Sequence, residues 1–231
     1  MPSVIVTGSC QGLGLEFCRQ YAAAGWRVLA TCLAPDTADT LNQLAAQFPR
    51  VTVLALDVMD FAAIDRLAES VATDAIDLLL CNAGVNPDNS GSGFGSLDYG
   101  AWREVLTINT LAQVKLAEAF LPHLKWGRRR QVAVISSCMS SIANNQSGGY
   151  ITYRPSKTAL NASMRSVAVD LRPHGISVLL LHPGWVRTSM GGPEAPLSPE
   201  ESITGLRRVI EAASPAQSGR LFDFEGKEMP W

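Results

Sequence analysis

The chain has 231 residues, enough for one large domain or two small ones with a sizeable buried core. Apolar residues make up 47% of it and charged residues 17%, the balance of an ordinary soluble globular protein. The formal net charge of −2 gives no electrostatic reason to expect a nucleic acid or an anionic membrane as a partner.

The cysteines and histidines argue against a disulfide scaffold and against a metal centre. The five cysteines are odd in number and scattered, and none forms a Cys-x-x-Cys pair, so a reducing cytoplasm is expected. The three histidines lack ligand spacing, so no metal site is expected. The chain start has no basic region followed by a long apolar stretch, and no apolar run could span a bilayer, so neither a signal peptide nor a membrane anchor is expected.

Apolar, β-rich runs alternate with amphipathic segments along the chain. The expected strands are Val4–Val6, Val28–Thr31, Val51–Leu56, Asp77–Cys81, Val132–Ser136, Ile176–Leu181 and Leu221–Phe224. The expected helices are Leu13–Ala24, Leu41–Phe48, Phe61–Ala72, Ala101–Lys125 and Arg154–Arg172. Continuous apolar strands separated by helices predict a Rossmann-type α/β fold, a doubly wound parallel sheet with helices on both faces. No linker or repeat divides the chain, so residues 1–231 are expected to form a single domain.

Two segments rich in proline, glycine and serine follow strand ends, Asn86–Ser96 and Gly191–Pro199. Loops at these ends of a parallel sheet carry ligands. The second segment is the better lid candidate, and residues 185–205 are expected to cover the substrate. The segment runs into Ser198-Pro199-Glu200-Glu201, which has the form of a helix N-cap followed by proline and acids.

A glycine-rich turn connects the first strand to the first helix. It carries Gly8, Gly12 and Gly14 in the spacing Gly-x-x-x-Gly-x-Gly, which differs from the common Gly-x-Gly-x-x-Gly fingerprint. Glycines at such a turn let the backbone approach a pyrophosphate, whose charge suits the N-terminus of a helix. The alternative is a tight turn with no ligand, and the position between an apolar strand and a helix favours the nucleotide.

Two further strand ends agree with a nucleotide site. Asp57 closes the third strand, where its carboxylate could accept a hydrogen bond from an adenine amino group. The small residues Asn82, Ala83 and Gly84 close the fourth strand, as a backbone passing close to a flat ligand requires. Ordinary turn chemistry is the alternative at each of these positions.

Tyr153 and Lys157 are four residues apart, so they lie on one face of a helix. A free tyrosine has a pKa of about 10, and a neighbouring cation brings it closer to neutrality. Pro155 is tolerated only in the first turn of a helix, which places Tyr153 at the helix entrance. With Asn109 and Ser137 upstream, the pair indicates a hydride-transfer site. The alternatives are a packing tyrosine, a capping serine and an asparagine satisfied by backbone.

At this point the chain closely resembles the classical short-chain dehydrogenase/reductases. The resemblance rests on motifs in the family's order that cover nearly the whole chain: Thr7-Gly8-x-x-x-Gly12-x-Gly14, Asn82-Ala83-Gly84, Asn109, Ile135-Ser136-Ser137, Tyr153-x-x-x-Lys157 and Pro183-Gly184. Within the family, the segments His182–Thr188 and Phe224–Trp231 resemble the C-factor and sniffer-type carbonyl reductases.

The resemblance implies a role for each of these residues. Tyr153 would be the general acid in carbonyl reduction or the base in alcohol oxidation, and Lys157 would bind the nicotinamide ribose and lower the tyrosine pKa. Ser137 would hydrogen-bond the substrate oxygen, and Asn109 would hold a water in a proton relay. The implied cofactor-binding residues are Gly8, Gly12, Leu13, Gly14, Asp57, Val58, Asn82, Ala83, Gly84, Tyr153, Lys157, Pro183, Gly184, Val186 and Thr188.

The end of the second strand bears on the choice of cofactor. NAD and NADP differ by a 2′-phosphate, which a carboxylate repels and an arginine attracts. The strand ends Ala30-Thr31-Cys32-Leu33, with no acid where NAD-using members of the family carry one. Leu33 also differs from the basic residue of many NADP users, and Asp36 is close in sequence. NADP(H) is expected as the preferred cofactor, with NAD(H) left open.

The leading hypothesis is an oxidoreductase that interconverts a carbonyl compound and an alcohol, as an NADPH-dependent carbonyl reductase. The alternative is a catalytically silent nucleotide-binding sensor or signalling protein on the same fold. Sugar-nucleotide epimerases share the Tyr-x-x-x-Lys pair, but only about fifty residues follow Pro183, too few for their separate substrate region. The family resemblance also implies a homodimer or homotetramer formed through Ala101–Lys125 and Arg154–Arg172.

Overall fold

The computed structural model describes residues 1–90 and 93–231. Gly91 and Ser92, which belong to the predicted Asn86–Ser96 loop, lie outside the described residues.

In the described part of the chain, seven parallel strands form one sheet in the order β3-β2-β1-β4-β5-β6-β7. Each predicted strand is confirmed to within one residue at each end, because continuous apolar runs are a strong signal for strands buried on both faces. The strands are β1 (Ser3–Thr7), β2 (Arg27–Cys32), β3 (Val51–Ala55), β4 (Leu78–Cys81), β5 (Gln131–Ile135), β6 (Ser177–His182) and β7 (Arg220–Asp223).

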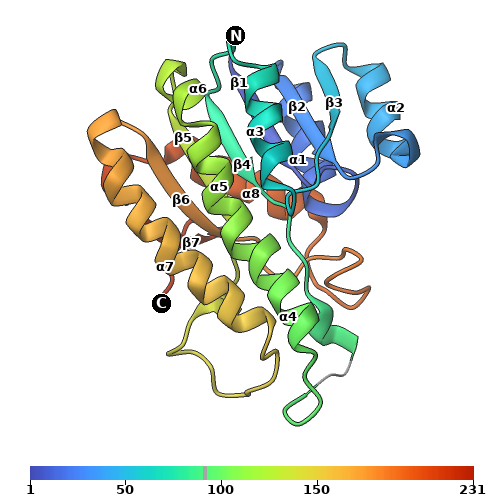
Figure 1. Cartoon of the computed structure of the whole chain (residues 1–231), viewed down its shortest axis with the longest axis vertical. Helices are drawn as coiled ribbons and strands as arrows, with labels where there is room; N and C mark the ends of the chain where they lie inside the picture. The colour runs from blue at the N-terminus through green and yellow to red at the C-terminus, as the bar shows by residue number, and fades with distance from the viewer. Residues whose placement is uncertain (91–92) are drawn as a thin grey trace.

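Helices cover both faces of this sheet (Figure 1). Helices α3, α5 and α7 lie in front of it in Figure 1, and α1 and α8 lie behind it. Among the described residues, no helix combines the length and the apolar character needed to cross a bilayer. The helices are α1 (Gly12–Ala23), α2 (Asp39–Gln47), α3 (Phe61–Ser70), α4 (Tyr99–Leu106), α5 (Ala112–Ala119), α6 (Leu121–Trp126), α7 (Tyr153–Leu171) and α8 (Pro199–Ala212).

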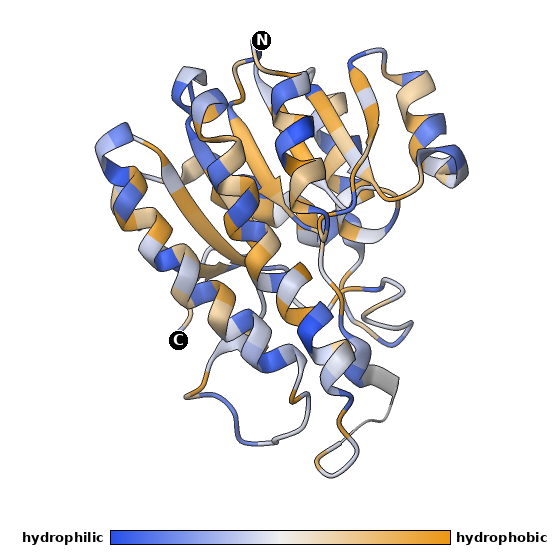
Figure 2. Cartoon of the chain, in the orientation of Figure 1, coloured by the Kyte–Doolittle hydropathy of each residue, from blue (hydrophilic) through white to orange (hydrophobic). Residues whose placement is uncertain are grey.

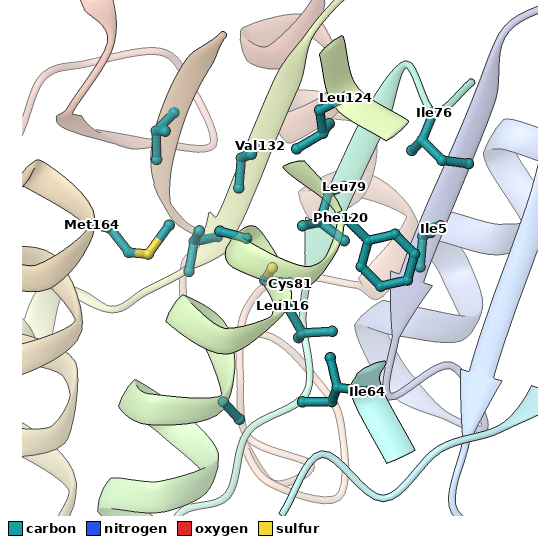
Figure 3. Packing of buried hydrophobic residues seen from close by; sticks show 14 of the residues in the cluster. Ile5, Ile64, Ile76, Leu79, Cys81, Leu116, Phe120, Leu124, Val132 and Met164 are labelled. Carbon is teal, nitrogen blue, oxygen red and sulfur yellow. The ribbon is translucent and has the colours of Figure 1, made fainter. Parts of the chain in front are cut away.

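Alternate residues of each strand enter two separate hydrophobic cores. Ile5 of β1 packs in the core under α3, α5 and α7, whereas its neighbours Val4 and Val6 pack in the core under α1, α2 and α8. The strands accordingly form the apolar centre of the molecule in Figure 2. Figure 3 shows the first core, where Phe120 and Leu116 lie against strand residues such as Leu79. The two cores hold helices on both faces of the sheet, so the loops that could bind a ligand lie at the carboxyl ends of the strands.

The single helix predicted over Ala101–Lys125 is wrong, because the structure divides it into three helices. Residues Thr107–Leu111 form a π-helical turn between α4 and α5. Helix α5 then ends before Phe120, and α6 begins after it. Pro122 occupies the first turn of α6, where an N–H group would have no partner within the helix. The apolar periodicity alone does not reveal either break.

The strand order reverses direction between β1 and β4. Strand β1 pairs with β2 on one side and with β4 on the other, so the loops that follow β1 and β4 leave in different directions. In open α/β sheets a ligand crevice forms at such a switch point, at the carboxyl ends of the strands. The glycine-rich turn after β1 and the Asn82–Gly84 turn after β4 lie at this position.

Candidate active site

A cavity of about 400 Å³ opens at the carboxyl ends of the strands. Most of the predicted cofactor-binding residues line it, from the loops after β1, β3, β4 and β6 and from helix α7. They are Gly8, Gly12, Leu13, Gly14, Asp57, Val58, Asn82, Ala83, Gly84, Tyr153, Lys157, Pro183 and Thr188. Strand ends that are far apart in the sequence therefore lie around the same cavity.

The N-terminus of α1 faces this cavity through the glycine-rich turn. A Cβ atom on Gly14 would overlap the carbonyl oxygen of Gly8, so only glycine allows the strand and the helix to approach so closely here. Gln11 at the N-cap of α1 makes no side-chain capping hydrogen bond. Helix N-termini without such a partner leave N–H donors free for an anion. This end of the cavity fits a pyrophosphate.

Asn82 holds the glycine-rich turn in place rather than facing a ligand. Its Nδ2 donates to the carbonyl oxygens of Thr7 (2.9 Å) and Gly8 (3.0 Å). In return, the Thr7 hydroxyl accepts hydrogen bonds from the backbone N–H groups of Asn82 and Ala83. The turns after β1 and β4 are thus joined by four hydrogen bonds. The strand-end position of Thr7 in the sequence gave no indication of this role.

Asp57 lines the cavity at the end of β3 and is exposed there. One carboxylate oxygen accepts a hydrogen bond from the Met59 N–H at 2.8 Å, which is the turn chemistry considered as the alternative. The other oxygen is left for a ligand, so the two interpretations are compatible.

Tyr153 begins helix α7, and Pro155 lies in the first turn, as the sequence predicted. The phenol lines the cavity and forms a hydrogen bond with the Ser137 side chain. Burial raises the pKa of Tyr153 to about 12, while the Ser137 hydrogen bond acts in the opposite direction. The lowering of this pKa by Lys157 that the resemblance implies is not found in the unliganded protein, where the phenol is protonated at neutral pH.

Lys157 is buried one turn further along α7. Its ammonium lies 5.8 Å from the centre of the Tyr153 ring and donates to the carbonyl oxygen of Ile135 at 2.9 Å. Within the described residues, no carboxylate forms an ion pair with it. Burial lowers the pKa of Lys157 to about 8. A buried cation that opens into a cavity without a counter-charge indicates a ligand with acceptor oxygens.

Asn109 lies in the π-helical turn, fully buried behind the cavity wall. Its amide exchanges two hydrogen bonds with the backbone of Val85, each 2.9 Å long, and donates a third to Ser156 at 3.0 Å. A Cβ atom on Gly84 would lie 3.2 Å from the Asn109 Oδ1 and 3.4 Å from the Lys157 Nζ, so both groups lie close to that glycine. Insertions that make π turns are frequent at functional sites.

Ser136 and Ser137, which are adjacent at the end of β5, have different surroundings. The Ser136 hydroxyl donates to Asn161 at 2.6 Å inside the protein. The Ser137 hydroxyl is directed to Tyr153 and also accepts the Met139 N–H at 3.1 Å. Ser137 is therefore the serine on the side of the phenol, whereas Ser136 contributes to the lining of the cavity.

Four predicted site residues do not line the cavity. Asn109 is fully buried, and Ser137 lies beside the phenol of Tyr153. Gly184 packs against Leu197, and Val186 is buried and forms a β-bridge with the same leucine. These last two residues shape the segment after β6 instead of facing the cavity.

Several uncharged residues that the sequence reasoning did not assign line the cavity near the expected ribose and adenine positions. Cys10, Gln11, Cys32 and Leu33 form this wall, and no charged side chain belongs to it, whereas Asp36 lies outside it. The sequence signal for them was the missing acid after β2. Ser189 and Met190, from the segment after β6, also line the cavity.

Comparisons with known proteins agree with this geometry. A family model described as short chain dehydrogenase matches residues 2–196. The C-signal protein of Myxococcus xanthus is 45% identical over 164 residues, which are 71% of this chain and 98% of that protein. An NADPH-bound carbonyl reductase from chicken fatty liver superposes with a TM-score of 0.93 at 34% identity, covering 100% of this chain and 99% of its own. The carbonyl reductase Sniffer of D. melanogaster gives a TM-score of 0.93 at 30% identity, with 100% of both chains covered.

Proposed function

We infer that this chain, which belongs to the short chain dehydrogenase family, is an oxidoreductase that interconverts carbonyl compounds and alcohols and works as an NADPH-dependent carbonyl reductase. One observation carries the proposal. A buried phenol and a buried ammonium on the first turns of α7 open into the same cavity as the uncapped N-terminus of α1. This arrangement combines a proton donor with a site for a dinucleotide.

The residues that would hold the dinucleotide follow from the cavity. The glycine-rich turn and the α1 N-terminus would bind the pyrophosphate, Asp57 the adenine, and Lys157 the nicotinamide ribose. The uncharged wall of Cys32 and Leu33 contains no carboxylate that would repel a 2′-phosphate, which supports NADP(H). When bound, the cofactor supplies the hydride.

The protein's own residues supply the proton and the polar contacts. The Ser137 hydroxyl would hold the substrate carbonyl oxygen beside the phenol of Tyr153, which would give its proton to the developing alkoxide. The phenol carries this proton at neutral pH, as the acid of a carbonyl reduction must, and burial raises its pKa to about 12. Asn109 would fix the Gly84–Val85 turn opposite Lys157, on the route by which the proton is replaced.

Residues 185–205 contribute the proposed lid within a single domain of residues 1–231. Ser189 and Met190 line the cavity, which supports the lid, and the Arg187 guanidinium donates to the carbonyl oxygens of Ala195 and Pro196 within the loop. From Pro199 onward the segment is the first part of α8, behind the sheet. The mobile part of the lid would therefore end at Ser198.

Free cysteines and exposed apolar side chains support a cellular location and an oligomeric state for the enzyme. The described cysteines are all free, which supports a cytoplasmic location. Val169 on α7 and Leu111 before α5 are exposed, at 47% and 52%, which supports a homodimer or homotetramer through these helices. Light scattering on the purified protein would measure the oligomeric state. The absence of nucleic-acid and membrane partners stays a prediction.

The test of the function is the Tyr153→Phe variant, assayed by the consumption of NADPH with a panel of small aldehydes and ketones. We expect the rate to fall at least about 100-fold, because a general acid contributes about that much or more. Binding of NADPH should be retained, because the ring stays in place.

Tyr99→Phe is the matched control. This tyrosine is 63% exposed on α4, so the loss of its hydroxyl should leave the rate unchanged. Full activity of Tyr153→Phe would show that the acid is assigned wrongly. NADPH binding without turnover on the whole panel would instead favour a nucleotide sensor.

A further inference from the structure

Asp88 contacts the start of the catalytic helix from a distant part of the chain. It follows β4 in the 3-10 turn Pro87–Ser90 and is 8% exposed. Its Oδ2 accepts the backbone N–H groups of Thr152 (3.1 Å) and Tyr153 (2.8 Å), and its Oδ1 accepts the Thr152 hydroxyl at 2.7 Å. Three hydrogen bonds thus join this one carboxylate to the residue that carries the phenol and to the residue before it.

Helix α7 has no N-cap of its own that could make these bonds. Thr152 at the N-cap position has helical backbone angles, with φ −88° and ψ −40°, and makes no side-chain capping bond. The first N–H groups of a helix have no partner within the helix, and a carboxylate near them also suits the helix dipole. Asp88 supplies this cap from outside, so the position of the first turn depends on the loop after β4.

Rigid placement matters at this turn because the phenol must reach the substrate oxygen together with the Ser137 hydroxyl. The residues just before the helix do not extend it, since Tyr150 has a left-handed φ of 51° and Gly148 and Gly149 also have positive φ. Errors of about 1 Å in the position of a catalytic group reduce rates by about 100-fold. A buried three-bond anchor at the Tyr153 backbone limits such errors.

We propose that Asp88 is a positioning residue that fixes Tyr153 for proton transfer by capping α7 from the loop after β4. The proposal rests on the proposed function, in which Tyr153 is the acid. Asp88 does not line the cofactor cavity, so its effect is on the chemical step and not on nucleotide binding.

The experiment compares Asp88→Ala, Asp88→Asn and the control Asp98→Ala in the full chain. Asp98 caps α4 through the N–H groups of Gly100 (2.7 Å) and Ala101 (3.0 Å), so its loss also removes a helix cap but leaves Tyr153 untouched. We expect Asp88→Ala to lower kcat about 10-fold to 100-fold with less than about a twofold change in NADPH Kd. Asp98→Ala should keep the wild-type kcat.

Asp88→Asn should restore most of the kcat. Its carbonyl oxygen can accept both N–H groups, and its amide can donate to the Thr152 hydroxyl, which is able to act as an acceptor. Hydrogen exchange gives a readout that does not depend on turnover. The Tyr153 amide should exchange faster in Asp88→Ala but not in Asp98→Ala, because only the first loses the acceptor of that N–H.

An unchanged kcat and an unchanged exchange rate at Tyr153 in folded Asp88→Ala would overturn the proposal. If Asp88→Ala does not fold, Thr152→Val removes one of the three bonds; slower turnover with faster Tyr153 exchange supports the proposal, and no change in either overturns it. The Tyr153→Phe variant tests the proposed function separately from the role of Asp88. Full activity of that variant contradicts the proposed function, whereas the exchange rate still reports whether Asp88 holds the helix.

Discussion

The ammonium of Lys157 is buried against the Ile135 carbonyl oxygen, and its pKa falls from 10.5 to about 8 because burial disfavours the charged form. This difference corresponds to about 3 kcal/mol of free energy that opposes folding at neutral pH. The position is therefore costly for the unliganded protein. Binding sites commonly retain such destabilising groups for function.

We expect Lys157→Met to stabilise the protein while abolishing carbonyl reduction and weakening NADPH binding. The gain in the free energy of unfolding at pH 7 should be about 2 kcal/mol, because the lost hydrogen bond to Ile135 offsets about 1 kcal/mol of the relief. Urea unfolding of both proteins measures this difference. A variant that is less stable at pH 7 would contradict the electrostatic account.

The pH dependence of this difference has a definite sign. Below about pH 8 both the folded and the unfolded protein keep the lysine proton, so the destabilisation is complete. Between about 8 and 10.5 the folded state releases the proton first and the unfolded state binds more, so wild-type stability rises relative to the variant. The advantage of Lys157→Met should therefore shrink across this window.

At the level of single residues, the sequence located the reacting groups better than their partners. The spacing of Tyr153 and Lys157 and the position of Pro155 were enough to place both side chains on the first turns of one helix. The partners of Asn82 could not be predicted, because its hydrogen bonds to Thr7 and Gly8 join residues 74 and 75 positions apart. Asp88 had no local signal for the same reason.

Helix α1 packs closely against the end of strand β1 at Gly14. The Cα of Gly14 lies against the Gly8 carbonyl, and the Asn82 amide is the next neighbour. A methyl group there would have to displace backbone, which cannot move aside as a flexible side chain does.

We expect Gly14→Ala to lower the free energy of unfolding by about 2–3 kcal/mol, in the range of overpacked sites, and to abolish NADPH binding. Gly93→Ala is the matched control, because a Cβ atom at that position meets nothing within 4 Å. Thermal unfolding and a nucleotide titration measure both effects. Normal stability of Gly14→Ala would show that the turn has room for a side chain.

The helices were predicted less completely than the strands. Apolar periodicity is continuous through residues 101–125, so it could not show that the π turn at Thr107–Leu111 inserts a residue. The turn is held by tertiary contacts, in which the Thr110 hydroxyl donates to the Ser156 carbonyl oxygen at 2.8 Å and Gln113 donates to Ile108 and Ala83. Such contacts become visible only when α7 is placed beside it.

For the whole molecule, the alternation of strands and helices was sufficient to predict a doubly wound parallel sheet. The order of the strands was not predicted, because apolar runs of similar composition do not show which strands are neighbours. The cavity follows from this order, because it puts the ends of β1 and β4 side by side. Strand propensity alone would not have located the crevice.

NADPH should raise the melting temperature of the whole protein. At about one hundred times its Kd, the cofactor adds about 2.7 kcal/mol of stability, which corresponds to roughly 5–10 °C for a chain of this size. Differential scanning fluorimetry measures the shift. NADH at the same concentration should give a smaller shift, and Tyr153→Phe should keep the NADPH shift. No shift with either nucleotide would contradict the assignment of the cavity.

The pairing of β1 with β4 also determines when the binding cleft can exist during synthesis. Val4 pairs with Leu78 in this part of the sheet. The turns after β1 and β4, which line the cavity, therefore cannot meet until about eighty residues have left the ribosome. Strands β5, β6 and β7 then add to one growing edge in the order in which they are translated. Parallel pairings of such long sequence separation form slowly, so the nascent chain exposes the apolar edge of β4 until the next strand arrives.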